Sequence, residues 1–140
     1  MINVLIDTNI LLDFIQHREN FSLSEQILTL CAEREINGFM AAHSVPNMFY
    51  ILRKGFSDEE RREILLSLAE LVPVVKIDHA KIVSALNQKS FTDFEDCLQC
   101  QCAKEINAKY IITRNVQDYL ESEIKAITSE EFLNLLKKKN

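Results

Sequence analysis

Oxygen-bearing side chains follow two short apolar runs and could together bind a metal ion. Asp7-Thr8-Asn9 comes directly after the run Ile2–Ile6, and Arg114-Asn115 with Asp118 follows the run Tyr110–Thr113. Each group brings a carboxylate, a hydroxyl and an amide to the end of a predicted strand. In parallel α/β sheets, ligands bind in the crevice beyond these carboxyl ends. A carboxylate there needs a hydrogen bond, an opposite charge or a cation.

Asp93 and Asp96 form a third acidic group, three residues apart at the start of a predicted helix, so they share one helix face. Helix capping alone explains Asp93. Asp96 lies one turn later beside the apolar stripe, where a solvated charge is less expected. Each acid taken singly could be a cap or a surface charge. Taken jointly with Asp7 and Asp118, they indicate a site for Mg²⁺ or Mn²⁺, which prefer oxygen ligands and can drive phosphodiester hydrolysis.

Composition limits the classes of protein that fit. With 140 residues, 47% of them hydrophobic, the chain suits a single domain spanning 1–140. A formal charge of -5 argues against a general nucleic-acid-binding surface, which would be basic. It does not exclude an enzyme that holds a phosphate backbone through a metal ion and a few cations.

The chain shows no signal-peptide pattern and no apolar stretch of the ~18 residues that cross a membrane. We therefore expect a cytoplasmic protein that makes no membrane contact. The cysteines, Cys31, Cys97, Cys100 and Cys102, lie in helical patterns and are expected to be reduced and structural.

The order of predicted elements indicates an α/β fold. Strand-like runs alternate with helical patterns, and the runs are Ile2–Ile6, Phe39–Ala42, Pro73–Ile77, Tyr110–Thr113 and Ile124–Thr128. Such alternation builds a parallel sheet covered on both faces. The continuously apolar run Ile2–Ile6 is expected at its centre. We predict a three-layer α/β/α sandwich with a mainly parallel, five-stranded sheet.

Capping patterns mark the expected starts of helices. The predicted caps or first residues are Ser22, Ser57, Asp78, Thr92 or Asp93, and Ser129. The helix opened by Ser22 is expected to run to about Ile36, where Asn37-Gly38 would end it. In the helix after Asp93, the residues expected to face inward are Phe94, Cys97, Leu98 and Cys102.

Three segments resemble the successive motifs of PIN domains. They are Leu5–Asp13, Asp93–Gln99 and Ile111–Tyr119, in the family's order and spanning nearly the whole chain. The likeness is closest to small single-domain prokaryotic members, which include VapC-type toxins. It implies a metal-dependent ribonuclease that uses Mg²⁺ or Mn²⁺. It also implies that Asp7, Asp96 and Asp118 are catalytic metal ligands, with Asn9, Thr113 and Asn115 supporting them.

One position departs from the family pattern. PIN domains usually carry an acidic residue early in the third helix, where this chain has Asn47. An amide oxygen can still coordinate a metal but brings no negative charge, so we expect weaker binding. Asp93 could compensate by sharing the ion, or the protein could have low or no nuclease activity.

Two functions of a PIN-like domain therefore stay open from the sequence, beside a third possibility, a nucleotide- or phosphate-binding α/β domain whose acids serve as helix caps. The first is an endoribonuclease, the toxin of a toxin–antitoxin pair, with RNA as substrate and an antitoxin as partner. The alternative is a catalytically weak or inactive PIN-like module that binds RNA or a protein. Arg114 is the best candidate for contact with RNA phosphate, since its planar fork suits phosphate, although a salt bridge to a neighbouring acid explains it equally well. Arg53 and Lys54 are weaker candidates.

We also expect a homodimer. Phe49–Leu52 is a run of four consecutive apolar residues on a predicted helix, too wide for one core-facing stripe. Leu65, Leu66 and Leu68 widen the next helix in the same way. The alternative is that other helices of the same chain cover these residues.

Overall fold

β1 (Asn3–Ile6) lies at the centre of a five-stranded sheet whose strand order is β3-β2-β1-β4-β5. The computed structural model describes residues 1–91 and 93–138. The outer strands are β2 (Asn37–Ala41), β3 (Val74–Val75), β4 (Tyr110–Ile112) and β5 (Ala126–Ile127). Every neighbouring pair is parallel. The central position predicted for Ile2–Ile6 and the five-stranded parallel sheet are both confirmed.

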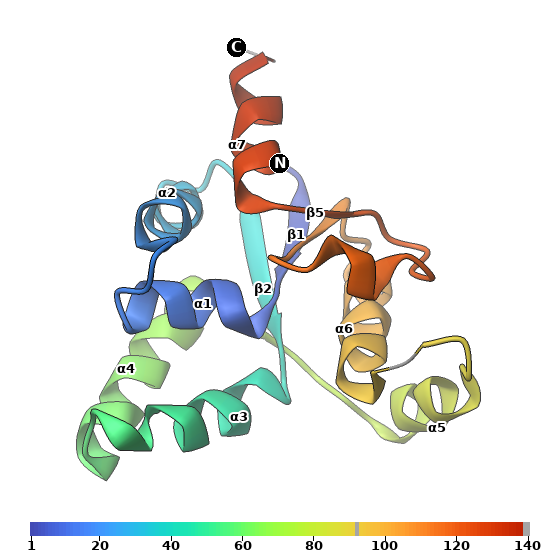
Figure 1. Cartoon of the computed structure of the whole chain (residues 1–140), viewed down its shortest axis with the longest axis horizontal. Coiled ribbons are helices and arrows are strands. Elements are labelled where there is room, and N and C mark those ends of the chain that lie inside the picture. The colour runs from blue at the N-terminus through green and yellow to red at the C-terminus, as the bar shows by residue number, and fades with distance from the viewer. Residues whose placement is uncertain (92, 139–140) are drawn as a thin grey trace.

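Helices cover both faces of the sheet (Figure 1). One side carries α1 (Thr8–Ile15), α2 (Phe21–Ala32), α3 (Ser44–Ile51) and α4 (Asp58–Leu71). The other carries α5 (His79–Asn87) and α6 (Phe94–Glu105). Two 3₁₀ turns, η1 (Leu52–Lys54) and η2 (Val116–Tyr119), follow α3 and β4, and α7 (Ser129–Lys138) closes the described chain. The predicted three-layer α/β/α architecture is confirmed.

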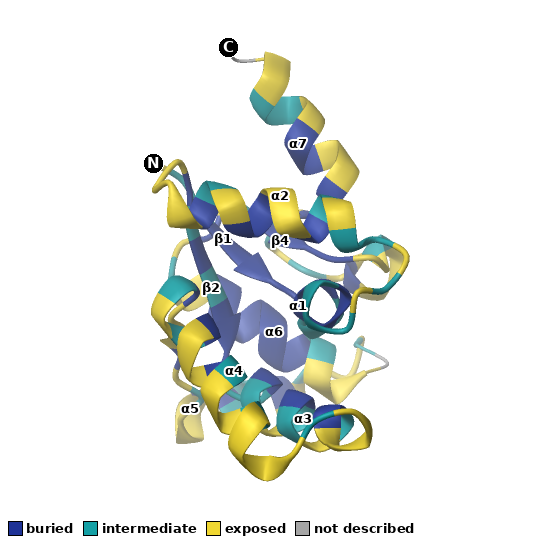
Figure 2. Ribbon diagram, turned by 90° about the vertical axis from the view of Figure 1, so that its left-hand side faces the viewer, coloured by how far each residue is buried: buried dark blue, intermediate teal, exposed yellow. Residues whose placement is uncertain are grey.

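The alternation of side chains along β1 divides the core between the two faces. Val4 and Ile6 join the cluster under α1, α2 and α4, whereas Leu5 joins the cluster under α6. All three side chains are fully buried. Figure 2 shows the strands largely buried and the helices exposed mainly on their outer faces. A strand buried on both sides in this way holds its carboxyl end rigidly, which matters for Asp7.

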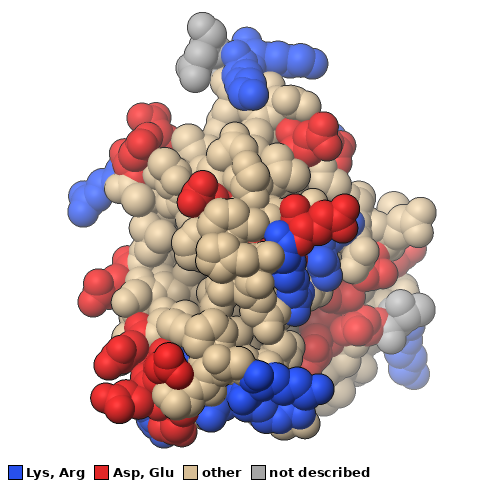
Figure 3. Space-filling model, turned by 60° about the vertical axis from the view of Figure 1, so that its left-hand side comes forward, with Lys and Arg blue, Asp and Glu red and all other residues tan. Residues whose placement is uncertain are grey.

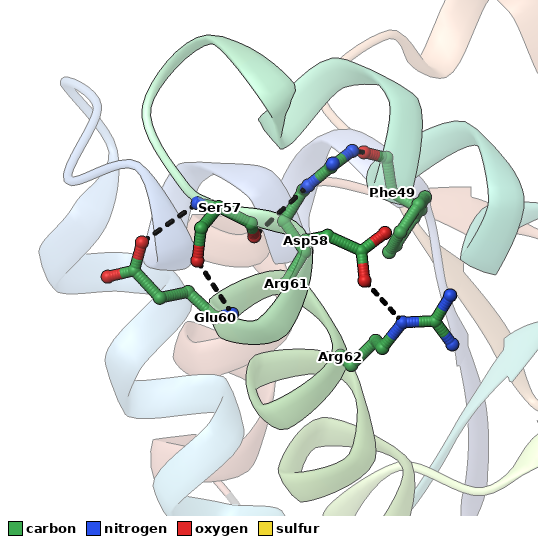
Figure 4. Close-up of polar contacts among 6 residues, drawn as sticks. All are labelled: Phe49, Ser57, Asp58, Glu60, Arg61 and Arg62. Carbon is green, nitrogen blue, oxygen red and sulfur yellow. Dashed lines mark hydrogen bonds and ion pairs between the residues drawn. The ribbon is translucent and has the colours of Figure 1, made fainter.

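The capping predictions mostly hold. Ser57 and Glu60 form the reciprocal capping box that opens α4 (Figure 4). Asp78 accepts from Lys81 N at the start of α5, and Asp93 accepts from Asp96 N at the start of α6. Ser129 is the first residue of α7. Thr92, the alternative cap of α6, lies outside the described residues.

Two sequence predictions are wrong. The helix expected to be capped by Ser22 and to run to Ile36 has Asn20 at its N-cap, two residues earlier, begins at Phe21 and ends at Ala32. Beyond it, Arg34 adopts a φ of 59° that stops the helix, and Asn37 already pairs with Asn3 in the sheet. Pairing with the central strand therefore outweighs local helix propensity.

The sequence pattern also predicts that Phe94 faces inward, and this is wrong, because Phe94 is 41% exposed. The first turn of α6, from Asp93 to Glu95, borders solvent. The other three inward predictions, Cys97, Leu98 and Cys102, are buried.

Two expectations from composition can be compared with the fold. All four cysteines are buried free thiols, and burial raises the pKa of Cys31, Cys100 and Cys102 to about 11. Within residues 1–91 and 93–138, none of the helices has the length and apolar character needed to cross a bilayer.

Candidate active site

A pocket of about 470 Å³ opens beyond the carboxyl ends of β1 and β4. Seven of the residues predicted for the site line it, namely Asp7, Asn9, Asn47, Asp93, Asp96, Asn115 and Asp118. Of the remaining two, Thr113 lies just behind the wall and Arg114 is turned to another partner. Residues far apart in the chain meet here because the parallel strands β1 and β4 are neighbours in the sheet.

Asp7 is the most buried acid of the pocket, at 9% exposure. Its backbone N–H donates to Ile112 O at 3.0 Å and so continues the pairing of β1 with β4. The fully buried Thr113 hydroxyl donates to Asp7 Oδ2 at 2.8 Å and accepts from Asn115 N at 3.2 Å. Burial raises the pKa of Asp7, and the hydrogen bond from Thr113 opposes that rise. Thr113 therefore holds the carboxylate in one orientation and favours its charged form.

Asp96 projects from the first turn of α6, which Asp93 caps. Tyr119 Oη donates to Asp96 Oδ1 at 3.2 Å. Burial raises the pKa of Asp96, and together with the negative charges of Asp93, Asp7 and Asp118 it brings that pKa to about 7, although the hydrogen bond from Tyr119 opposes the rise. The four carboxylates are thus close enough to repel one another, which is the electrostatic environment that a cation relieves.

The donor set fits a hard divalent cation held largely through water. All the acidic groups offer oxygen ligands. Among the described residues, no three Asp, Glu, His or Cys side chains are close enough together to surround one ion. This arrangement suits Mg²⁺, which usually binds one or two carboxylates and keeps several waters. It does not suit an ion that must be surrounded by protein ligands alone.

Asn47 lies on α3 and lines the same pocket as the acids. Its Nδ2 donates to Glu95 Oε1 at 3.4 Å. Glu95 is exposed, as its sequence position indicates, yet it reaches across the pocket to this amide. The bond uses the amide nitrogen of Asn47 and does not involve its oxygen.

Arg114 forms a salt bridge to a neighbouring acid, the alternative to RNA contact that the sequence leaves open. Its Nη1 lies 3.2 Å from Oδ1 of Asp13, a fully buried carboxylate on α1. Arg18 approaches the same oxygen at 3.7 Å and donates to Asn9 Oδ1 at 3.4 Å. Both guanidiniums thus compensate Asp13, Arg18 also contacts Asn9, and Arg114 is not among the residues lining the acidic pocket.

Sequence reasoning missed a polar cluster in the pocket floor. Thr8 Oγ1 and Ser44 Oγ are 2.7 Å apart, and Gln99 Nε2 lies 3.5 and 3.4 Å from them. Gln99 is only 2% exposed. His43, whose pKa burial lowers, also lines the pocket. His43 and Ser44 follow β2, so the strand-end rule applied to β1 and β4 would have found them.

Most of the chain matches the model of a known protein family. The family model of the PIN domain matches residues 3–117 of the chain. The protein belongs to the PIN domain family. The match contains the pocket acids Asp7, Asp93 and Asp96 and ends just before Asp118.

Among relatives of this PIN domain, Ribonuclease VapC1 of Aquifex aeolicus (strain VF5) is 26% identical over an alignment of 133 residues that covers 92% of this chain and 92% of that protein. Two solved structures share the fold. One is VapBC2 from Rickettsia felis bound to a promoter DNA fragment, with a TM-score of 0.66, 15% identity, and coverage of 91% of this chain and 98% of that one. The other is VapBC-1 from nontypeable Haemophilus influenzae, with a TM-score of 0.64, 20% identity, and coverage of 93% and 99%.

Proposed function

We propose that this PIN domain protein is a divalent-metal-dependent endoribonuclease that cleaves RNA phosphodiester bonds. The observation that carries the proposal is the convergence of Asp7, Asp93, Asp96 and Asp118 on one pocket at the carboxyl edge of the sheet. The similarity to Ribonuclease VapC1 supports the same chemistry.

In this proposal Asp7, Asp96 and Asp118 hold Mg²⁺ or Mn²⁺ partly through bound water, because the three carboxylates do not surround one ion directly, and Asp93 adds negative charge beside it. The bound ion would polarise the scissile phosphate and generate an activated water. Thr113 and Tyr119 act as positioning residues, because each donates a hydrogen bond to one of these carboxylates. Asn9 and Asn115 support the pocket wall, and Asn47 contributes an amide oxygen at the position where the family usually has an acid.

We also propose that the enzyme is the toxin of a toxin–antitoxin pair, with an antitoxin protein as partner. Its fold relatives VapBC2 and VapBC-1 are described as complexes, and another is a toxin–antitoxin complex from Klebsiella pneumoniae. Expression of the chain alone is expected to slow growth, and co-expression of the protein encoded beside it is expected to restore growth.

Cleavage of a labelled single-stranded RNA tests the activity. We expect cleavage that requires Mg²⁺ or Mn²⁺, that chelation stops, and that Asp7→Asn abolishes. Glu33→Gln, the same loss of charge at an exposed residue that follows α2, is the matched control and should cleave like the parent. Metal-dependent cleavage that survives in Asp7→Asn would show that the pocket is not the active site.

Asn47 favours a second candidate, a PIN-like module that binds RNA or protein without cleaving. With an amide at this position, the pocket holds one carboxylate fewer than the family pattern. Calorimetric titration with Mn²⁺ separates the candidates, because a nuclease must bind the ion. Asn47→Asp adds a charged oxygen ligand and should tighten Mn²⁺ binding and raise cleavage if Asn47 faces the ion.

A further inference from the structure

An exposed aromatic ring stands at the mouth of the acidic pocket with a guanidinium stacked on it. Tyr50 lies on α3, one turn after Asn47, lines the pocket and is 62% exposed. The Cζ atom of Arg53 lies 3.7 Å from the centre of the Tyr50 ring, and Arg53 Nη1 donates to Tyr50 O at 2.8 Å. The guanidinium covers one face of the ring and is tied to its backbone.

We propose that Tyr50 and Arg53 bind an unpaired RNA base and its phosphate beside the acidic pocket. The base would stack on Tyr50, and the guanidinium of Arg53 would contact the adjacent phosphate. The inference rests on the proposed ribonuclease function, because it assigns the substrate class of the same pocket as single-stranded RNA.

Arg53 has no carboxylate partner among the described residues, and its two neighbours on α4 are held by other contacts. Arg62 pairs with Asp58 at 2.6 Å, and Arg61 donates to Phe49 O at 2.7 Å while its Cζ lies 4.1 Å from the Phe49 ring centre (Figure 4). These contacts commit Arg61 and Arg62 to the joint between α3 and α4. The charge of Arg53 remains available to an anion, and a planar guanidinium matches phosphate well.

The charge around the pocket makes such a cation necessary. Five acidic residues line it, namely Asp7, Asp93, Glu95, Asp96 and Asp118, and the whole chain carries -5. In Figure 3, acidic groups are scattered over a largely uncharged face, and Lys and Arg lie at its top, right of its centre and along its lower edge. RNA approaching a negative pocket needs a nearby positive group to hold its backbone. Arg53 supplies that positive charge directly beside Tyr50, which lines the pocket.

The geometry favours an unpaired base over a duplex. In a double helix both faces of each internal base are stacked, whereas single-stranded RNA can turn a base onto an aromatic side chain. Such stacking tolerates any base and contributes about 1–3 kcal/mol per base. A protein segment is the competing occupant of this surface, and the test below separates it from RNA.

Binding of a labelled single-stranded RNA can be measured in an Asp96→Asn background, which keeps the RNA intact. Tyr50→Ala should weaken binding roughly 5- to 150-fold, the equivalent of one lost base stack, and Tyr50→Phe should restore it. Leu86→Ala removes a comparably exposed apolar side chain, 63% exposed on α5, and should have no effect. One abasic nucleotide at the stacked position should weaken binding to the protein with Tyr50 but not to Tyr50→Ala.

The contribution of Arg53 has its own readout. Arg53→Ala should lower the slope of binding against salt concentration by about 1, as expected for one lost phosphate contact. The matched control is Lys109→Ala, since Lys109 also lies over a tyrosine ring, at 6.0 Å from Tyr110, but at the opposite end of β4. It should leave the slope unchanged.

Each outcome decides a different point. If Tyr50→Ala changes RNA affinity by less than about twofold, its effect is no larger than that of an ordinary surface substitution, and the inference is wrong. Metal-dependent cleavage by the parent would then still support the proposed function. If Tyr50→Ala loses affinity but the parent cleaves no RNA with any metal, the base site stands and the nuclease proposal fails. If Tyr50→Ala weakens only the binding of the co-expressed neighbouring protein, the surface is a protein contact and the inference is overturned.

Discussion

Replacing Thr113 with Val tests how the pocket holds its most buried acid. The two side chains have nearly the same shape, so the change removes a hydroxyl and little volume. Thr113 is fully buried, and its hydroxyl makes the 2.8 Å hydrogen bond to Asp7 Oδ2 and the 3.2 Å bond from Asn115 N. Both bonds are lost in Thr113→Val, and Asp7, at 9% exposure, has little water available as a substitute donor.

The expected loss of stability follows from these two bonds. A hydrogen bond to a charged group contributes about 1.5–3 kcal/mol, and one between neutral groups about 1 kcal/mol. We expect Thr113→Val to lower the free energy of unfolding by about 2–4 kcal/mol, which corresponds to a fall of roughly 10 °C in Tm for a domain of this size.

The loss should also depend on pH. Burial already raises the pKa of Asp7 in the folded protein, and removing the Thr113 donor raises that pKa further. A carboxyl group with a raised folded pKa contributes stability below its unfolded pKa and loses that contribution as the pH rises through the folded pKa. The destabilisation in Thr113→Val should therefore be largest above the folded pKa of Asp7, where the carboxyl group is ionised, and smaller below that pKa, where it is protonated.

Urea unfolding across a series of pH values, from acid to alkaline, in buffer with a chelator, measures both effects. Thr29→Val is the control, because the Thr29 hydroxyl donates at 2.8 Å to a neutral carbonyl, Glu25 O, on an exposed helix face. It should lose about 1 kcal/mol or less, with no dependence on pH. Equal losses in the two variants, or a loss in Thr113→Val that pH does not change, would refute this account of how Asp7 is held.

Three further predictions concern the metal, the packing and the assembly. Since the pKa of Asp96 is raised to about 7 and a cation binds the ionised carboxylate, stabilisation by Mn²⁺ in a thermal melt should grow as pH rises through 7, and Asp96→Asn should remove that pH dependence. Gly38→Ala should destabilise the fold by about 1–3 kcal/mol, because a Cβ would lie 2.6 Å from Cys31 Sγ, whereas Gly55→Ala, with nothing within 4 Å, should be neutral in the same urea assay. Light scattering at micromolar concentration should give a dimer mass, since Leu66 on α4 is 68% exposed and such apolar surface commonly lies at interfaces, and a monomer mass at every concentration would refute the dimer.

Several features of this protein could be predicted from the sequence because they depend on local patterns. The apolar run around Val4–Ile6 marks a central strand, since only a strand buried on both faces lacks polar alternation. The capping box of Ser57 involves residues three apart. The side chains of Asp78 and Asp93 likewise accept from a backbone N–H three residues later, in the first turn of their own helices. The acids Asp7, Asp96 and Asp118 stand at element ends, where the topology of a parallel sheet brings them to one edge.

Tertiary structure alone decided the contacts between residues distant in the chain. Which cations compensate Asp13, and whether Arg114 faces that acid or the pocket, depends on how α1 packs against the segment after β4. The cluster of Thr8, Ser44 and Gln99 joins three helices and has no local signature.

The end of α2 and the exposure of Phe94 were misjudged for the same reason. Local propensity favours a longer helix up to Ile36, but the pairing of Asn37 with the central strand removes those residues from it. Phe94 has an apolar side chain at helical spacing, yet the first turn of α6 borders solvent. A sequence pattern reports which residues prefer burial, and only the packed fold determines which of them find a partner surface, because burial depends on what lies opposite each side chain.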